Sequence, residues 1–314
     1  MPSNKDLNKA LKNKKDEFYT QLTDIEKELK YYTNHFEGKT VFCNCDDPEN
    51  SNFWLYFQLN FTKLKLKKLI STHFEDSKPS YKLELTKDEN GDGKIDHLDI
   101  IKTTLRQNGD FRSPECIEIL KEADIVVTNP PFSLFREYIA QLFKYNKKFL
   151  IIGNINALKY KEVFPYIVNN KVWLGRSIHS GDREFSVPDS YPLKAANCRI
   201  DENGKKYIRV KGVRWYTNLE YKERYEDLIL YKQYNETDYP KYDSFDAIEV
   251  GKTTEIPMDY NGIMGVPITF IDKYNPNQFE IIGELNHGCD NEYDLGKPIL
   301  NGKEKFPRIL IRKR

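Results

Sequence analysis

The chain has 314 residues, of which 39% are hydrophobic and 13% aromatic, and this is enough to bury a core and excludes a globally disordered protein. Its 49 Lys and Arg nearly balance 48 Asp and Glu, so the formal net charge of +1 excludes a uniformly basic protein but allows a local basic face. No apolar run approaches the ~18 residues of a membrane span, and the Lys-rich N-terminus does not resemble a secretory signal. The five cysteines lack the spacing of disulfides or of a zinc site. We therefore expect a cytoplasmic protein without bound metal.

The N-terminal region is expected to be helical over residues 3–36. Leu22, Ile25 and Leu29 recur at the spacing of one helix face. The tetrapeptide Glu-Phe-Tyr-Thr at 17–20 interrupts this pattern and marks a break between two helical pieces.

Between residues 38 and 178 short apolar strands alternate with helices. This rhythm predicts a parallel sheet covered by helices on both faces, and therefore the α/β fold class. Asn90-Gly91-Asp92-Gly93 marks a hairpin tip, and Ser113 followed by Pro114 marks a helix start. The expected strands are 39–45, 66–72, 124–128 and 147–154, the expected helices are 51–61, 114–123, 133–145 and 161–170, and the expected hairpin is 81–101.

The composition changes after about residue 180. Tyr, Pro, Gly and Asn become frequent, and short alternating runs such as "KYIRVKGVRWYTNL" at 206–219 follow. This pattern is typical of a smaller, mostly β, loop-rich region. We therefore expect one domain over residues 1–180, with a helical N-terminus at 1–37, and a second over 181–314.

Several strands are followed by polar or aromatic residues that a simple turn does not require. These residues are Cys43 to Asp46, His73 to Glu75, Asp110 with Phe111, and Asn129 to Phe132. Ligands of open parallel sheets bind outside the carboxyl ends of the strands. The sequence therefore predicts a ligand site at this one edge of the sheet.

The stretch "DIVVTNPPFSLF" ends a buried strand on Asn129-Pro130-Pro131-Phe132. The amide oxygen of Asn129 and the carbonyl of Pro130 can accept both hydrogens of an aromatic exocyclic amine. The two prolines stiffen the corner, and Phe132 offers a ring face for stacking. Such a clamp suits alkylation of a weakly basic amine. A simple Pro-Pro turn is the alternative interpretation.

An alkyl donor needs a pocket of its own, and the other strand ends supply candidates. Residues 17–20 can cover the adenine and carboxylate of such a donor. The turn at 43–46 lies between a strand and a helix, where backbone N–H groups can meet a carboxylate. Glu75 suits ribose hydroxyls, while Asp110 suits an adenine amino group with Phe111 beside the ring.

These motifs, in this order, resemble the EcoRI-type adenine-specific DNA methyltransferase family. The stretches that carry the resemblance are "DEFYTQL", "VFCNCDDPENSNFW", "GDFRSPECIEILKEADIVVTNPPFS" and "VKGVRWYTNL", and the likeness covers nearly the whole chain. It implies a Rossmann-like catalytic domain that binds S-adenosyl-L-methionine, methylation of the adenine amino nitrogen, and a C-terminal target-recognition region. This order of motifs is called the γ class.

The resemblance also assigns roles to single residues. It implies catalytic roles for Asn129, Pro130, Pro131 and Phe132. The residues implied to bind the cofactor are Phe18, Tyr19, Thr20, Cys43, Asn44, Cys45, Asp46, Glu75, Asp110, Phe111 and Asn129. Residues 43–46 depart from the family pattern, because most methyltransferases carry a Phe-x-Gly-x-Gly loop there.

A duplex adenine reaches such a site only after it rotates out of the stack. Residues expected to contact the target base or the DNA, besides Phe132, are Arg183, Arg214, Trp215 and Tyr216, with the loop 185–188 beside them. Arg176, Arg199 and Arg209 are further candidates for phosphate contacts.

Residues 88–99 resemble a calcium-binding loop in their spacing of Asp88, Asn90, Asp92 and Asp99. An EF-hand needs a bidentate Glu at its twelfth position and a helix on each side. Here the flanking residues alternate as strands do, so we expect a hairpin tip rather than a calcium site.

The leading hypothesis is a DNA-adenine methyltransferase of the restriction-modification or orphan type, acting as a monomer, with a cognate endonuclease as a potential partner. The alternatives are a methyltransferase for RNA adenine or a protein glutamine amide, and a catalytically dead DNA-binding relative. Glutamine enzymes usually carry Tyr at the position of Phe132, and this disfavours that alternative.

Overall fold

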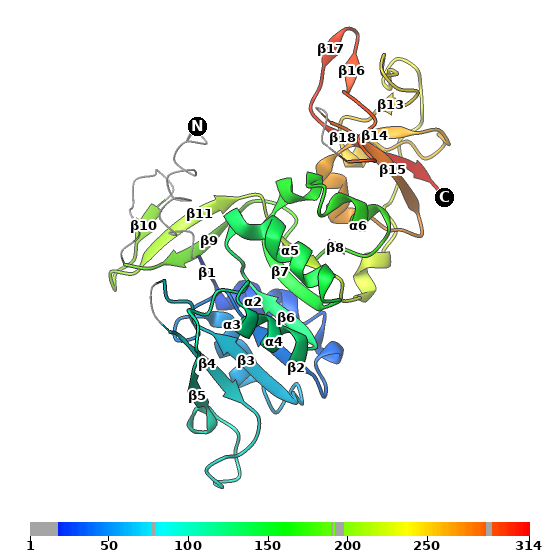
Figure 1. Ribbon diagram of the computed structural model, residues 1–314. Helices are drawn as coiled ribbons and strands as arrows, with labels where there is room; N and C mark the ends of the chain where they lie inside the picture. The colour runs from blue at the N-terminus through cyan, green and yellow to red at the C-terminus, as the bar shows by residue number, and fades with distance from the viewer. Residues whose placement is uncertain (1–17, 77–78, 190, 192–197, 287–290) are drawn as a thin grey trace. The chain divides into compact units, whose positions relative to one another are not determined.

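The computed structural model describes residues 18–76, 79–189, 191, 198–286 and 291–314. The chain divides into two compact units (Figure 1). Unit 1 comprises Met1–Ile155 and Ser180–Leu219, and unit 2 comprises Asn156–His179 and Glu220–Arg314. Among the described residues, none of the helices is long and apolar enough to cross a membrane.

Unit 1 is built around a mixed sheet in which seven of its strands follow the order β5-β4-β3-β2-β6-β7-β12. The four strands from β3 to β7 are mutually parallel, and β4, β5 and β12 are added by antiparallel pairing. These strands are β2 (Thr40–Cys43), β3 (Lys68–Thr72), β4 (Tyr81–Leu85), β5 (Ile101–Thr104), β6 (Ile125–Thr128), β7 (Lys148–Asn154) and β12 (Val213–Thr217). The α/β class and the parallel centre of the sheet are confirmed.

The central strands of this sheet are buried, whereas β5 at its edge is exposed. β2 and β6 are buried along their whole length, as their continuous apolar sequences predict. The helices of unit 1 are α2 (Leu22–Leu29), α3 (Asn52–Leu59), α4 (Pro114–Glu122) and α5 (Phe135–Lys144), and its 3-10 helices are Thr33–His35, His97–Asp99 and Phe132–Leu134. Ser51 and Ser113 cap α3 and α4, and Pro114 occupies the first turn of α4 as expected.

A second sheet of unit 1 has the order β1-β9-β11-β10 and is antiparallel throughout. Its strands are β1 (Tyr19–Thr20), β9 (Asp182–Val187), β10 (Cys198–Ile200) and β11 (Lys206–Lys211). In the pairing of β1 with β9, Tyr19 lies opposite Ser186 and Thr20 opposite Phe185. The sheet therefore joins the start of the described chain to a hairpin more than 160 residues later.

Unit 2 is mostly β and rich in loops, as the composition predicts. Its main sheet has the order β13-β14-β18-β15, and β16 pairs with β17 in a separate hairpin. The elements are α6 (Phe164–Val168), β8 (Trp173–Leu174), β13 (Ile248–Glu249), β14 (Met264–Pro267), β15 (Phe279–Leu285), β16 (Ile299–Leu300), β17 (Lys303–Glu304) and β18 (Arg308–Lys313), with 3-10 helices at Ile155–Lys159, Lys222–Tyr225, Thr253–Glu255 and Ile268–Lys273.

Three local expectations differ from the structure. Residues 1–17 lie outside the described residues, and the rest of the expected N-terminal helix contains β1 before α2 begins. The expected loop 185–188 is strand as far as Val187, because it pairs with β11. The helix expected at 161–170 is reduced to α6, which begins one residue before Pro165.

Candidate active site

The candidate site lies where the sheet of unit 1 changes its winding direction. The chain passes from β2 to β3 on one side, then returns to β6 on the other side of β2. The loops after β2 and β6 diverge at such a point and leave a crevice for a ligand. Here the two loops are residues 43–46 and 129–132, and the Thr128 hydroxyl donates a hydrogen bond to the main-chain oxygen of Asn44.

Asn129 is 5% exposed and is the first residue after β6. Its side-chain Nδ2 donates to the main-chain oxygen of Phe18 at 2.5 Å. The other atom of the amide, Oδ1, is buried and accepts no hydrogen bond from any described residue. An unpaired buried acceptor costs folding free energy, so this oxygen needs a partner such as an ordered water or a ligand.

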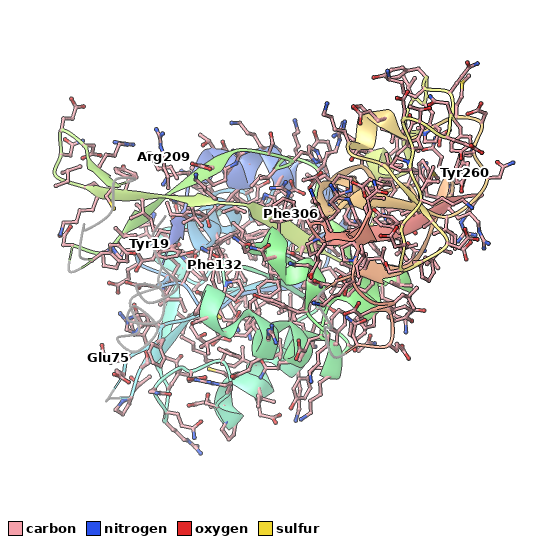
Figure 2. All side chains as sticks on the ribbon, turned by 90° about the horizontal axis from the view of Figure 1, so that it is seen from above. Tyr19, Glu75, Phe132, Arg209, Tyr260 and Phe306 are labelled. Atoms are coloured by element: carbon pink, nitrogen blue, oxygen red, sulfur yellow. The ribbon has the colours of Figure 1, made fainter. Side chains whose placement is uncertain are left out.

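An aromatic cluster includes Phe18, whose main-chain oxygen holds the Asn129 amide, and Phe132, which follows Asn129 by three residues. Phe132 lies 5.8 Å from Phe18 and 6.4 Å from Phe185, in each case edge to face. Phe18 also contacts Tyr191, at 6.1 Å. Phe132 is half-buried and is labelled in Figure 2 beside Tyr19, the residue after Phe18. Phe18 and Phe132 thus bring contacting rings to the residue whose main-chain oxygen holds the Asn129 amide and to the loop after β6.

The loop 43–46 contains no glycine but still needs a left-handed residue, since Cys45 has a φ of 72°. Its polar groups are tied to the surrounding elements. Ser71 of β3 donates to the Cys43 oxygen at 2.5 Å, and Ser51 donates to the Asp46 carboxylate at 3.1 Å. Tyr138 of α5 donates to Oδ1 of Asn44. Burial raises the pKa of Tyr138, so the hydroxyl remains a donor.

Glu75 and residues 108–111 come together at the same edge of the sheet. The Glu75 amide donates to the Asn108 oxygen at 2.8 Å. Gly109 has a φ of +81°, and a Cβ there would lie 1.8 Å from the His73 oxygen, so only glycine allows this approach. The Glu75 side chain is half-buried and makes no hydrogen bond or ion pair with any described residue.

The Asp110 carboxylate is already engaged by Arg112. Its two oxygens accept from Nε at 2.9 Å and from Nη2 at 2.7 Å of the same guanidinium. Oδ1 also accepts from the main-chain N–H of Arg112 at 2.8 Å, so the carboxylate is held in place by the residue two positions along the chain. Phe111 is buried and lies 5.1 Å from the ring of Tyr138, edge to face.

Of the arginine, tryptophan and tyrosine residues expected to contact the target base, three lie on β12 and one lies on β9. Trp215 and Tyr216 are fully buried in β12, because its antiparallel pairing with β7 places it inside the central sheet. Arg214 is also buried, at 3% exposure. Arg183 is half-buried on β9, and its alternation along the strand places it on the same face as Phe185.

Hydrogen bonds from its own main-chain N–H groups to Asp99 stabilise the loop 88–99. Both oxygens of Asp99 accept backbone hydrogen bonds, which come from Glu89, Asn90 and Asp96. β4 and β5 pair on either side as a hairpin, but the second strand begins only at Ile101, because the 3-10 helix His97–Asp99 replaces the alternating strand expected before it. In the described ranges, His, Cys, Asp and Glu side chains form no group of three or more that could hold a metal ion.

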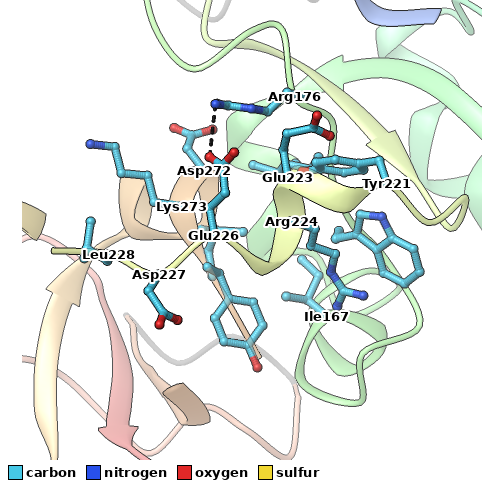
Figure 3. A pocket seen from close by; sticks show the side chains of 14 residues that line it. Ile167, Arg176, Tyr221, Glu223, Arg224, Glu226, Asp227, Leu228, Asp272 and Lys273 are labelled. Carbon is cyan, nitrogen blue, oxygen red and sulfur yellow. Dashed lines mark hydrogen bonds and ion pairs between the residues drawn. The ribbon is translucent and has the colours of Figure 1, made fainter. Parts of the chain in front are cut away.

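Unit 2 contains a separate cavity of about 190 Å³, shown in Figure 3. Arg224 forms part of its wall, stacked 3.8 Å above the Trp173 ring and hydrogen-bonded to Glu220 and Asn170. Acidic residues, including Glu223 and Glu226, lie around it, so its charge does not favour a phosphate.

The comparisons with known proteins agree with these motifs. The family model described as "Adenine-specific methyltransferase EcoRI" matches residues 6–314. The chain belongs to this family. It is 51% identical to the Type II methyltransferase M.EcoRI of Escherichia coli, over 99% of this chain and 97% of that protein. The family and the enzyme class expected from the sequence are therefore confirmed.

Two mycoplasma proteins also match the chain. They are the Type II methyltransferases M.MgeORF184P of Mycoplasma genitalium and M.MpnI of Mycoplasma pneumoniae. Each is 41% identical over 98% of this chain and 98% of its own length. No solved structure matches the chain.

The sequence did not indicate the residues that connect the two loops of the candidate site. Thr128 and Tyr138 were assigned only to a strand and a helix, and Tyr191 was not singled out. The Phe18 main-chain oxygen was also not expected to hold the Asn129 amide. For Tyr138 one signal existed, since a tyrosine on the buried face of a helix usually needs a hydrogen-bond partner.

Proposed function

We propose that the protein transfers a methyl group from S-adenosyl-L-methionine to the exocyclic amino nitrogen of adenine in duplex DNA, at residues 129–132. The observation that carries this proposal is the buried Oδ1 of Asn129, which accepts no hydrogen bond from a described residue and lies three residues before Phe132 in the same loop. The central sheet of unit 1 is then the Rossmann-like methyltransferase sheet, and the crevice between β2 and β6 is its donor and acceptor site.

The chain orients the amine with acceptors rather than with a base. Asn129 Nδ2 is held by Phe18, so Oδ1 faces the site as an acceptor, and the Pro130 carbonyl provides a second one. Two accepted hydrogens draw the lone pair of the amine away from conjugation with the ring. The protonated form of an adenine amine has a pKa far below neutral. The amino nitrogen is therefore uncharged at neutral pH and needs no deprotonation before it attacks.

Residues around the crevice fit the donor. Thr20 Oγ1 is buried without a hydrogen-bond partner among the described residues, and it can donate to a carboxylate. The free Glu75 carboxylate suits a ribose diol, while Asp110 and Phe111 suit an adenine ring. When bound, S-adenosyl-L-methionine supplies a sulfonium-activated methyl group. The chain's own residues hold the amine in line and exclude water from it.

A duplex adenine must leave the stack to reach Asn129, at a cost of a few kcal/mol. We assign the stacking surface for the extruded base to Phe132, with Phe18 and Phe185 behind it. We assign target recognition to residues 181–314 and the catalytic domain to residues 1–180. We expect a monomer of the restriction-modification or orphan type, for which a cognate endonuclease acting on the same site is a potential partner.

Incubation with labelled S-adenosyl-L-methionine and mixed-sequence duplex DNA tests this function. We expect label in N6-methyladenine, and loss of transfer in Asn129→Ala with donor affinity retained within about twofold. Parallel reactions with RNA and with glutamine-containing peptides address the two other amine substrates. Label in RNA or peptide but not in duplex DNA would overturn the proposed substrate, and donor binding without any transfer would indicate a catalytically dead relative.

A further inference from the structure

Asn44 is fixed by two hydrogen bonds from the part of the chain that carries the catalytic loop. The Thr128 hydroxyl donates to its main-chain oxygen, and the Tyr138 hydroxyl donates to its side-chain Oδ1. Thr128 immediately precedes residues 129–132, and Tyr138 lies on α5, which begins three residues after them. The loop after β2 is thus tied to both ends of the catalytic segment.

This connection matters because the loop 43–46 has no glycine. Cys45 adopts a left-handed conformation that non-glycine residues rarely adopt, and neighbouring contacts must hold it there. Asn44 is 2% exposed and Tyr138 is fully buried, so water does not compete for their hydrogen bond. Glycine could adopt this left-handed conformation without strain. Because the loop has none, the hydrogen bonds to Asn44 stabilise its conformation instead.

Tyr138 also contacts Phe111, which lies in another loop expected to bind the donor. Its ring packs against Phe111 at 5.1 Å with an interplanar angle of 75°. The Phe111 oxygen in turn accepts from Gln141, one turn further along α5, at 3.1 Å. A single buried side chain on α5 thus contacts both the loop 43–46 and the loop that contains Phe111.

We propose that Tyr138 is a positioning residue that holds the donor-binding loop 43–46 and the Phe111 loop in register with the catalytic loop 129–132. The proposal rests on the proposed function, because it takes these loops to be the donor pocket. Tyr138 has no direct part in the chemistry. Its hydroxyl orients Asn44, and Asn44 orients the backbone on which the donor rests.

Tyr138→Phe tests this role, because it removes the hydroxyl and keeps the ring against Phe111. We expect the Kd for S-adenosyl-L-methionine, measured by titration calorimetry, to rise about tenfold, as the net loss of one buried hydrogen bond predicts. The KM for the donor should rise in parallel, while kcat at saturating donor and the KM for DNA stay within about twofold. Thr128→Val removes the other hydrogen bond to Asn44 and should act in the same direction.

Thr217→Val is the matched control. Thr217 is a fully buried residue of β12 whose hydroxyl donates to the Phe149 oxygen at 2.7 Å, away from the loops of the site. It should lower the Tm as Tyr138→Phe does, with an unchanged donor Kd. If Tyr138→Phe and Thr128→Val lowered only the Tm, or if Thr217→Val raised the donor Kd equally, the positioning role would be overturned. A wild-type protein that failed to bind the donor would instead contradict the proposed function.

Discussion

The side-chain amide of Asn129 donates to the main-chain oxygen of Phe18, 111 residues earlier in the chain, at 2.5 Å. This bond settles which atom of the amide is left as an unpaired acceptor, because only Nδ2 can donate to a carbonyl. The acceptor oxygen therefore needs no reorientation when a substrate arrives, and such preorganisation is a major source of catalytic stabilisation.

Asn129→Asp should reveal what this orientation contributes. The aspartate keeps two acceptor oxygens but cannot donate to the Phe18 carbonyl, so two acceptors would face each other and the carboxylate would turn or shift. We expect single-turnover methyl transfer to fall about 10- to 100-fold, less than in Asn129→Ala, with donor affinity little changed. A variant with the wild-type rate would show that the Phe18 carbonyl plays no part in orienting the amide.

Phe185→Leu should distinguish a role of the aromatic cluster in catalysis from its general contribution to stability. Phe185 is 1% exposed and supports both Phe18 and Phe132. A smaller side chain should lower the free energy of unfolding by about 1–2 kcal/mol and let Phe132 shift, so that kcat falls as well. Phe36→Leu is the matched control, since Phe36 is fully buried against Phe57 in the same unit. Equal losses of kcat in both variants would argue against a specific role for Phe185.

The central sheet was predictable because its signals are local. The segments 124–128 and 147–154 are short runs of β-branched and other apolar residues, and helix-start signals such as Ser113-Pro114 separate the strands. The carboxyl ends of parallel strands lie along one edge of a sheet, so the sequence also predicts that the loops 43–46 and 129–132 lie close together.

The remaining features depend on contacts between distant segments, which no local pattern carries. The pairing of β1 with β9 and the bond from Asn129 to Phe18 are of this kind. The expected alternation at 206–219 is interrupted at Gly212, whose φ of +71° ends β11 and lets the following residues enter the central sheet. That is why Trp215 is buried on a strand whose sequence resembled a half-exposed one.

Arg183→Met should weaken DNA binding and its dependence on salt. Arg183 lies on the face of β9 that carries Phe185, and no carboxylate of the described residues forms an ion pair with it. Loss of one phosphate contact should reduce the slope of log K against log salt by about 0.9. Arg199→Met is the control, since its Nε and Nη2 both donate to the Glu184 carboxylate, at 2.9 and 2.5 Å. The idea is untenable if the two variants give the same slope in fluorescence anisotropy titrations.

Glu84→Gln should make stability less dependent on pH in the acid range. Burial alone would raise the pKa of Glu84, but hydrogen bonds and charges from Lys68 and Lys82, at 2.6 and 2.7 Å, lower it below the ordinary value of 4.5. A carboxylate whose folded-state pKa is lowered stabilises the fold above its unfolded-state pKa. That contribution is lost as the pH falls through the lowered value. At pH 7 the variant should therefore be less stable by about 1 kcal/mol.

As the pH falls below 4.5, the Tm of Glu84→Gln and that of the wild type should converge, because the wild-type carboxylate then also loses its charge. Glu118→Gln is the control, because Glu118 pairs with Lys121 on the exposed surface of α4, where its side chain is 70% exposed. That pair should contribute little at any pH. Thermal melts across pH 3–8 check both expectations, and a Tm difference that stayed constant down to pH 3 would show that the Lys68–Glu84–Lys82 cluster is not the source of the acid sensitivity.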